Sequence, residues 1–229
     1  MTEKIETINS VRNKLGLQEL DVLYQTGEDG LKPTQGYDDD FAYDMYAAVG
    51  ALVPPLTFKA VIIPTQFKTA FDPKQAGELV ALRSGIGANT PLIITNAPGI
   101  IEGTYRGEHN ILVRNMFIDN SLVPFVFDIK GRQIPLSEVP KDVLDEARQK
   151  FLEESEQLGY PALNEVQEQT VFKTVIPRGT IYVAKHDRIA QLFYVNKIKA
   201  NFIESDSLPE SIRGEGKFGS SGSNAKGEK

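Results

Sequence analysis

The chain of 229 residues is 41% hydrophobic and 24% charged, which indicates one principal folded domain with additions. Its net charge of −6 argues against a surface that binds nucleic acid directly, so any polyphosphate site must use a few placed cations and a metal ion. The sequence has no cysteine, no apolar run of about 18 residues and no basic-then-apolar leader, so we expect a cytoplasmic protein without disulfides, thiolate chemistry or a membrane span.

The first segment, residues 1–20, is predicted to form a short amphipathic helix. Apolar residues recur there at three- and four-residue spacing before Gly16, which is a suitable helix stop. These apolar residues are Ile5, Ile8, Val11 and Leu15. We expect the stripe to dock on the main body or on a neighbouring subunit, and recruitment of a separate partner is the alternative.

From Asp21 onward the sequence changes to short β-prone runs separated by glycine and proline. Many short strands with turn signals between them favour an all-β sandwich or barrel over an α/β sheet. The expected strands are Asp21–Tyr24, Phe58–Ile63, Glu78–Leu82, Leu92–Thr95, Ile111–Ile118 and Leu122–Phe127.

Three consecutive aspartates, Asp38–Asp40, precede the sequence AYDMYA, which contains Asp44. A solvated acidic loop is the preferred interpretation, because a metal site needs oxygens that converge from several directions. A calcium or magnesium site at these aspartates is the alternative.

Two glycine-containing clusters, Ala81–Gly87 and Asn96–Glu108, flank the short apolar run Pro91–Thr95. In the first cluster, Arg83-Ser84-Gly85 offers a guanidinium, a hydroxyl and an unobstructed N–H, which suit a phosphate. In the second cluster, Pro98-Gly99 between β-prone residues predicts a hairpin turn whose backbone is open to a ligand.

Residues 130–169 are predicted to contain a helix of about five turns with an acidic outer face. Ser137 is a candidate cap, Pro140 fits the first turn, and Gly159 with Pro161 ends the helix. Its apolar stripe consists of Val143, Leu144, Ala147, Phe151 and Leu158. The segment either packs on the edge of the β domain or forms an interaction surface.

Strands are expected again at Val171–Ile176 and Thr180–Ala184, followed by the sequence DRIAQLFYV from Asp187. The alternation in this sequence buries Ile189 and Leu192 and leaves Arg188 or Gln191 free for another contact. The composition of residues 205–229 indicates a disordered tail, yet Arg213 and Phe218 within it suit a lid that covers a base and pairs with phosphate oxygens.

Five segments occur in the order of the five motifs of the trimeric dUTPase family, which this chain therefore resembles, from about Asp21 to Gly222. The segments are AYDMYA around Asp44, Arg83–Gly87, Asn96–Glu108, DRIAQL at Asp187–Leu192 and RGEGKFGSSG at Arg213–Gly222. The resemblance implies an all-β, distorted jelly-roll fold of the β-clip type that assembles as a homotrimer. It divides the chain into residues 1–20, a β domain at 21–200 with a helical insertion at 130–169, and a C-terminal arm at 201–229. Phage members often carry an insert at this point that contacts regulatory proteins, so the resemblance supports the alternative that the insertion is an interaction surface for such a partner.

The resemblance also implies hydrolysis of dUTP to dUMP and pyrophosphate by attack of water on the α-phosphorus, which keeps uracil out of DNA and supplies dUMP. Glu102 is the expected catalytic base, and Asp44 is expected near the Mg²⁺ ion, acting through water. The substrate-binding candidates are Arg83, Ser84, Gly85, Asn96, Gly99, Ile100, Ile101, Tyr105, Gln191, Arg213, Phe218, Gly219 and Ser220. Without the resemblance, Tyr105 reads as a core aromatic and Gln191 as part of a strand interior.

Some residues depart from the family pattern, notably Glu102, where the family carries aspartate. Glutamate carries its carboxylate on a side chain one methylene longer than that of aspartate. Three interpretations remain: the backbone compensates for the extra length, the enzyme is slow, or Glu102 is a substitution in this sequence. A dCTP deaminase of the same fold and a dUTP-sensing regulatory protein are the alternative functions. We expect His109 and His186 to be surface or loop residues, because neither has a companion ligand nearby in the sequence.

Overall fold

The computed structural model describes residues 19–119 and 121–215, and the chain divides into one unit that ends at Lys197 and a second that starts at Ile198. Within the described part of the first unit, short strands dominate, so the prediction of an all-β fold is confirmed. The strands are β1 Leu23–Thr26, β2 Tyr43–Tyr46, β3 Ala51–Val53, β4 Val61–Ile63, β5 Phe67–Ala70, β6 Ala76–Leu82, β7 Leu92–Ile94, β8 Gly99–Ile101, β9 Ile111–Asn115, β10 Leu122–Val123, β11 Phe125–Asp128, β12 Gln133–Pro135, β13 Ile176–Pro177, β14 Ile181–Val183 and β15 Arg188–Asn196. The helices are α2 Ser84–Asn89, the 3-10 helix η1 Leu136–Glu138, α3 Lys141–Gln157 and α4 Glu165–Thr170.

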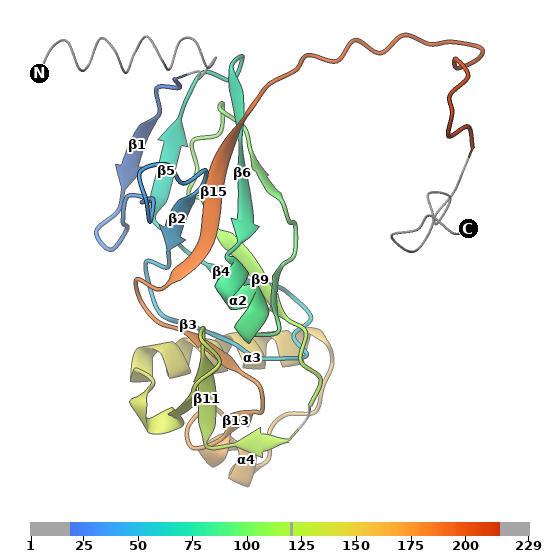
Figure 1. Cartoon of the computed structure of the whole chain (residues 1–229). Coiled ribbons are helices and arrows are strands. Elements are labelled where there is room, and N and C mark those ends of the chain that lie inside the picture. The colour runs from blue at the N-terminus through green and yellow to red at the C-terminus, as the bar shows by residue number, and fades with distance from the viewer. Residues whose placement is uncertain (1–18, 120, 216–229) are drawn as a thin grey trace, which may run out of the picture. The chain divides into compact units, whose positions relative to one another are not determined.

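Three larger sheets and two strand pairs make up the first unit. The central sheet has the order β2-β15-β6-β8, and a three-stranded sheet has the order β4-β9-β7. A further sheet, β12-β11-β14-β3, contains the parallel pair β11–β14, and β1 pairs with β5 while β10 pairs with β13. Neighbours in the sheets are mostly distant in sequence, as expected for a jelly roll. Figure 1 shows β2, β15 and β6 side by side.

The main core forms where inward side chains of the central and three-stranded sheets meet. In β6 and β9 every second residue is buried, as period-two alternation predicts. Val80, Val113 and Ile189 belong to this core, and each buried aliphatic side chain contributes about 1.5–3 kcal/mol. In β15 a register shift between Arg188 and Ala190 lets the adjacent residues Ile189 and Ala190 both be buried.

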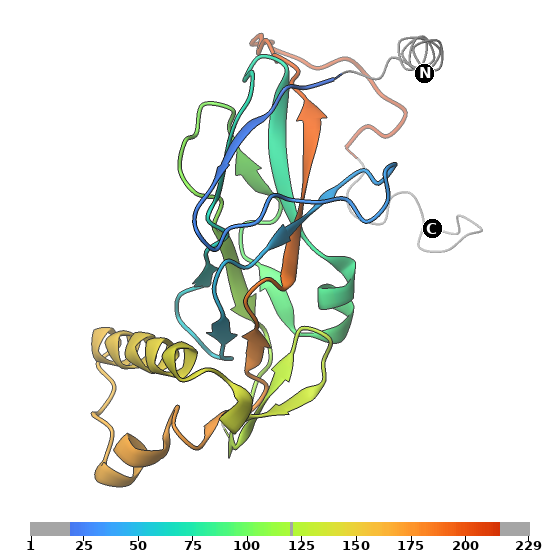
Figure 2. The same cartoon turned by 90° about the vertical axis from the view of Figure 1, so that its left-hand side faces the viewer.

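The helical insertion has a smaller core of its own. Leu136, Val139 and Val143 pack with residues of the β strands, among them Val126 and Ile176. Figure 1 and Figure 2 show α3 and α4 at the end of the unit away from β1 and β5. The insertion is therefore attached to the β domain through a second hydrophobic cluster.

The predicted helix of the insertion is confirmed, although its start differs. Helix α3 has 17 residues and its N-cap is Pro140 without a side-chain cap, whereas Ser137 lies in η1. The helix ends as predicted, because Gly159 adopts φ +70° just past the C-cap Leu158 and donates its N–H to Glu156 O.

Two expectations about local structure were wrong. Residues 171–176 form mostly turns, with Phe172 at φ +58°, and only Ile176 enters a strand. Pro98-Gly99 does not close a hairpin, because β7 pairs with β9 whereas β8 pairs with β6. The segment instead connects two different sheets, and Gly99 is the first residue of β8.

Residues 1–18 of the predicted N-terminal helix lie outside the described residues, and Glu19 and Leu20 are not helical. Among the helices that the structure describes, none is long and apolar enough to cross a membrane. In the described part of the second unit, residues 198–215, the chain forms bends and turns and exposes Ile198, Phe202, Ile203, Leu208 and Ile212.

Candidate functional site

The central sheet brings three of the predicted segments into register. Gln191 on β15 lies opposite Asp44 on β2 and opposite Ala81 on β6, two residues before Arg83. On the other edge of β6, Val80 lies opposite Gly99 and Glu78 lies opposite Ile101 on β8. Segments separated by up to about 150 residues therefore lie on four adjacent strands, with Arg83 just past one end of β6 and Glu102, which follows Ile101, beside its other end.

Asp44 is buried and bridges two arginines. Its Oδ1 accepts a hydrogen bond from Arg83 Nε at 2.7 Å, and its Oδ2 accepts one from Arg188 Nη1 at 3.2 Å. The Asp44 side chain is 6% exposed, whereas those of Arg83 and Arg188 are 30% and 49% exposed. The carboxylate therefore holds one nitrogen of each guanidinium group in place. Both guanidinium groups remain partly exposed to solvent, where they can bind an anion.

Arg188 was not among the predicted site residues. The sequence left open whether Arg188 or Gln191 was free for another contact, and the structure pairs Arg188 with Asp44. The register shift at Arg188–Ala190 places this pairing, and such a bulge has no signal in the strand pattern.

Arg83, Ser84 and Gly85 lie at the junction of β6 and α2. The predicted loop is a short helix here, since Ile86 N and Gly87 N both donate to Arg83 O at 3.1 Å. Ser84 and Gly85 are exposed, and a Cβ atom on Gly85 would meet nothing within 4 Å. This surface is sterically open to a ligand beside Arg83.

A small pocket lies where β8 passes β9, and four predicted substrate contacts line it. These are Asn96, Gly99, Ile100 and Ile101, and the rest of the lining is Val80, Ile94, Asn110, Ile111 and Leu112. The Asn96 amide and the strand backbone place polar groups beside aliphatic side chains, which is the composition that suits a flat heterocycle.

The segment from Glu102 to Glu108, here called the 102–108 loop, follows β8 directly. Glu102 is exposed, and its carbonyl accepts a hydrogen bond from Tyr105 N at 2.8 Å, which forms a turn. Arg106 Nη1 donates to Gly103 O at 2.6 Å and to Tyr105 O at 2.8 Å. The loop is thus folded on itself, with the Glu102 carboxylate presented to solvent.

Tyr105 is 48% exposed, so the alternative that it is a core aromatic is wrong. Its ring lies over Gly107, where a Cβ atom would come within 2.1 Å of Tyr105 Oη. The same hydroxyl donates to Glu108 O at 3.3 Å. Gly107 is therefore needed for the position of the ring.

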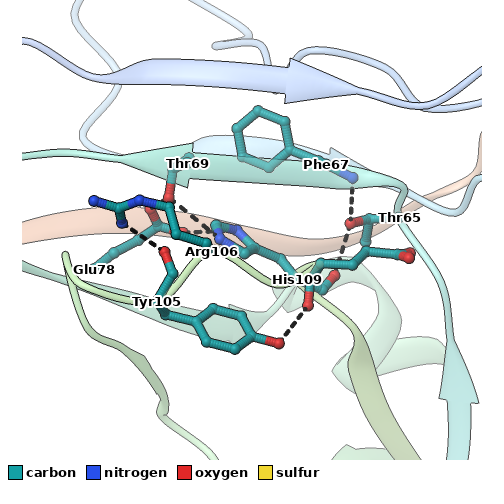
Figure 3. Close-up of polar contacts among 8 residues, drawn as sticks. Thr65, Phe67, Thr69, Glu78, Tyr105, Arg106 and His109 are labelled. Carbon is teal, nitrogen blue, oxygen red and sulfur yellow. Dashed lines mark hydrogen bonds and ion pairs between the residues drawn. The ribbon is translucent and has the colours of Figure 1, made fainter.

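His109 was expected to be a surface or loop residue; it lies in the loop before β9, but its side chain is completely buried. His109 Nδ1 lies 3.0 Å from Glu78 Oε1, and Nε2 lies 3.2 Å from Thr69 Oγ1. Figure 3 shows Thr69, Glu78 and the His109 ring pointing toward one another. The sequence offered one indication of this buried contact. Glu78 alternates with Ala76 and Val80 on the inward face of β6, so a charged residue at that position needs a buried polar partner. His186 is exposed, as expected.

Asp187 begins the segment that contains Gln191 and is half-buried. Its carboxylate accepts a hydrogen bond from Ala184 N at 2.8 Å, and burial raises the pKa of Asp187. Its role is local, because it closes the turn between β14 and β15.

Arg213 belongs to the second unit and is exposed. Phe218, Gly219 and Ser220 lie outside the described residues. The predicted role of this arm stays a prediction.

The described residues contain no group of three or more histidine, aspartate or glutamate side chains able to hold a metal ion. In the acidic loop, Asp40 Oδ2 accepts a hydrogen bond from Tyr37 N at 2.9 Å, as in an ordinary turn. Both oxygens of Asp44 are engaged by arginine. This donor set fits a Mg²⁺ ion that arrives on phosphate oxygens and is completed by water, and it does not fit a protein cage.

No protein-family model matches the sequence. A deoxyuridine 5'-triphosphate nucleotidohydrolase of Tropheryma whipplei is 24% identical over 193 residues, which cover 84% of this chain and 90% of that protein. The fold is similar to that of the Staphylococcus bacteriophage 80alpha dUTPase solved with dUPNHPP, with a TM-score of 0.65, 21% identity and coverage of 89% of this chain and 99% of that chain.

A single-residue variant of the dUTPase from phage phi11 of S. aureus, described with a structural Mg(II) ion, has a TM-score of 0.59 and 22% identity and covers 84% of this chain and 100% of that chain. The solved structures establish the shared fold, and the sequence relatives extend over most of the chain. The chain therefore has the fold of the phage dUTPases, and it is similar in sequence to deoxyuridine 5'-triphosphate nucleotidohydrolases over most of its length.

Proposed function

We propose that this protein hydrolyses dUTP to dUMP and pyrophosphate, and that it does so in the cytoplasm, where it keeps uracil out of DNA and supplies dUMP. The observation that carries the proposal is that one sheet carries the Asp44–Arg83 pair at one end of β6 and the Asn96–Ile101 pocket with the exposed Glu102 toward its other end, so that adjacent copies of the chain would complete each site. These are, respectively, an anchored cation, a site for a base and a carboxylate that can accept a proton.

The pocket lined by Asn96, Gly99 and Ile100 would hold the uracil ring. Backbone N–H and C=O groups held in β8, together with the Asn96 amide, would match the donors and acceptors of uracil and leave those of cytosine unpaired. Tyr105 would stack on the deoxyribose, so that a 2'-hydroxyl would clash with its ring.

Arg83, Ser84, Gly85 and Gln191 would hold the triphosphate. Arg83 is the strongest contact, since Asp44 fixes its Nε and leaves the rest of the guanidinium free to meet phosphate oxygens. A bound Mg²⁺ ion would neutralise charge on the phosphates, with Asp44 acting on it only through water. The arm, with Arg213, Phe218, Gly219 and Ser220, would cover the nucleotide on an adjacent subunit.

Glu102 would act as the general base. Its carboxylate would take a proton from water while the water oxygen bonds to the α-phosphorus. The bond from the α-phosphorus to its bridging oxygen would break, and pyrophosphate would leave with that oxygen and the bonding electrons. The products are dUMP and pyrophosphate.

A homotrimer is the assembly that we propose. The outer face of the three-stranded sheet exposes Ile62 on β4 and Ile93 on β7, and this apolar surface supports contact with another copy. Measurement of the molar mass in solution by light scattering tests this assembly, and a monomer would contradict it.

The test of the activity is release of pyrophosphate from dUTP, dTTP, dCTP and UTP at equal concentration. We expect turnover of dUTP to exceed that of each competitor by at least about 100-fold, because unpaired polar groups penalise the wrong base. Equal turnover of all four nucleotides would refute the proposal. Ammonia release from dCTP would favour the deaminase alternative.

The insertion at residues 130–169 is also proposed to bind a regulatory protein. Its exposed Tyr160 and Val166 support this proposal. A second support is the similar fold of the 80alpha dUTPase, which is one of the phage dUTPases that control transfer of virulence genes. Deletion of the insertion would remove Leu136 and Val143 from the second core, so substitution of Tyr160 and Val166 by serine is the sharper test. Loss of partner binding with retained dUTP hydrolysis is expected, and unchanged binding would contradict the proposal.

A further inference from the structure

The buried pair of Glu78 and His109 lies directly beneath the 102–108 loop. Both side chains are 0% exposed, and Glu78 Oε1 lies 3.0 Å from His109 Nδ1. Thr69 Oγ1 joins the pair, because it donates to Glu78 Oε2 at 3.1 Å and lies 3.2 Å from His109 Nε2. Figure 3 shows this cluster with Tyr105 on the far side of the His109 ring.

The two partners lie at the two ends of the loop. Glu78 is opposite Ile101, the residue before Glu102, in the β6–β8 pairing. His109 is the first residue after the loop, and its backbone is fixed at both groups. His109 N donates to Phe67 O at 2.9 Å, and Thr65 Oγ1 donates to His109 O at 2.7 Å. The Glu78–His109 contact therefore links the strand pairing at Ile101, just before the loop, to His109, just after it.

Aromatic rings packed against His109 also restrict the exposed part of the loop. Tyr105 stacks on the His109 ring with centroids 6.4 Å apart, and Phe67 meets the same ring edge-on at 5.2 Å. Gly103 packs so tightly that a Cβ atom would lie 2.9 Å from Phe71 O. Displacement of His109 would therefore displace Tyr105.

The buried pair is not expected to stabilise the fold more than apolar residues would at the same positions. Glu78 Oε1 and His109 Nδ1 face each other at 3.0 Å without the alignment of a hydrogen bond, and neither has another hydrogen-bond partner among the described residues. Burial, the charge of Glu78 and a hydrogen bond to its carboxylate raise the pKa of Tyr194, which places a fourth polar group in the cluster. Well-packed apolar residues in place of such a pair are often as stable or more stable.

We infer that Glu78 and His109 are positioning residues that hold the 102–108 loop, and thereby Glu102 and Tyr105, in the geometry required for catalysis. The inference rests on the proposed function only in treating this loop as part of the catalytic site. The pair does not touch substrate, so its effect passes through the backbone at Ile101 and through the Tyr105 ring.

The test uses the full-length protein with Glu78→Gln, with His109→Phe and with both changes together. Phenylalanine keeps an aromatic ring against Phe67 and Tyr105, and the double variant carries no buried charge. We expect kcat for dUTP to fall about 10- to 100-fold in all three variants, because a shift of about 1 Å at the reacting groups has that effect. The affinity for the non-hydrolysable analogue dUpNHpp should fall by no more than about tenfold, because the Tyr105 ring shifts while the phosphate contacts at Arg83 are unchanged.

A role in folding alone predicts a different pattern. The double variant would then recover the kcat of the unmodified protein, because removal of both partners leaves no uncompensated charge in the core. Ile176→Val is the matched control, because Ile176 lies in the second core and its change should leave kcat unaffected.

Hydrogen–deuterium exchange without nucleotide gives a readout that does not depend on dUTP hydrolysis. Amides of the 102–108 loop should exchange at least about tenfold faster in the variants, whereas those of β11 should not change. An unmodified protein that fails to hydrolyse dUTP refutes the proposed function, and the exchange data still decide the inference. Unchanged exchange in the loop, or full kcat in the double variant, would overturn it.

Discussion

Replacement of Asp44 by asparagine tests the anchoring of the two arginines. The amide keeps the shape of the carboxylate, but its Nδ2 presents N–H groups to one guanidinium and removes one charge-assisted hydrogen bond. Such a bond contributes about 1.5–3 kcal/mol. Because Arg83 and Arg188 are 30% and 49% exposed, the released guanidinium regains water and offsets part of the loss. We expect the free energy of unfolding to fall by about 1–2 kcal/mol, which is roughly 5- to 30-fold in the folding equilibrium.

The effect on activity should be larger than the effect on stability. Arg83 without its anchor samples other rotamers, and a misplacement of about 1 Å lowers kcat/KM for dUTP by about 100-fold. Urea unfolding and pyrophosphate release measure the two effects on the same samples, with the exposed Asp38→Asn as a matched control. An Asp44→Asn variant that differs from the unmodified protein by less than about 0.5 kcal/mol and retains kcat/KM would refute the reasoning.

Three further predictions concern single residues. Glu102→Gln should lower kcat for dUTP by about 100-fold or more and leave dUpNHpp affinity nearly unchanged, since it removes the base and keeps the side-chain size; equal losses in both would contradict the assignment. Gly107→Ala should raise KM for dUTP by about tenfold, because the added Cβ lies 2.1 Å from Tyr105 Oη and the ring must move; steady-state kinetics check this. The raised pKa of Asp187 means that the folded state binds more protons than the unfolded state between the two pKa values, so stability falls as pH rises through that window. Asp187→Asn should remove this fall in urea titrations from about pH 4 to 7, and an unchanged slope would exclude Asp187 as its source.

Regular patterns in the sequence predicted the parts of the fold that local interactions determine. The alternation in β6 and β9 and the three- to four-residue spacing in α3 each specify which face is buried. The end of α3 at Gly159 follows from the left-handed conformation that glycine adopts at little cost. These predictions needed no knowledge of the strand partners.

Other features depend on contacts between distant segments and could not be predicted locally. Pro98-Gly99 looks like a hairpin turn in sequence, yet the strands on its two sides choose different partners, β9 and β6. His109 has no companion nearby in the sequence, and Glu78 comes from another strand. The pairing of Arg188 with Asp44 likewise depends on a register shift in β15. The order of the motifs in the sequence indicated which segments belong to the candidate site, but only the strand topology determined which of these segments lie next to one another.

The most direct test of the account is hydrolysis of dUTP in ¹⁸O-labelled water, with mass spectrometry of both products. Attack of water on the α-phosphorus predicts that the label enters dUMP and that pyrophosphate is unlabelled. Label in pyrophosphate, release of inorganic phosphate, or no turnover of dUTP would contradict the account.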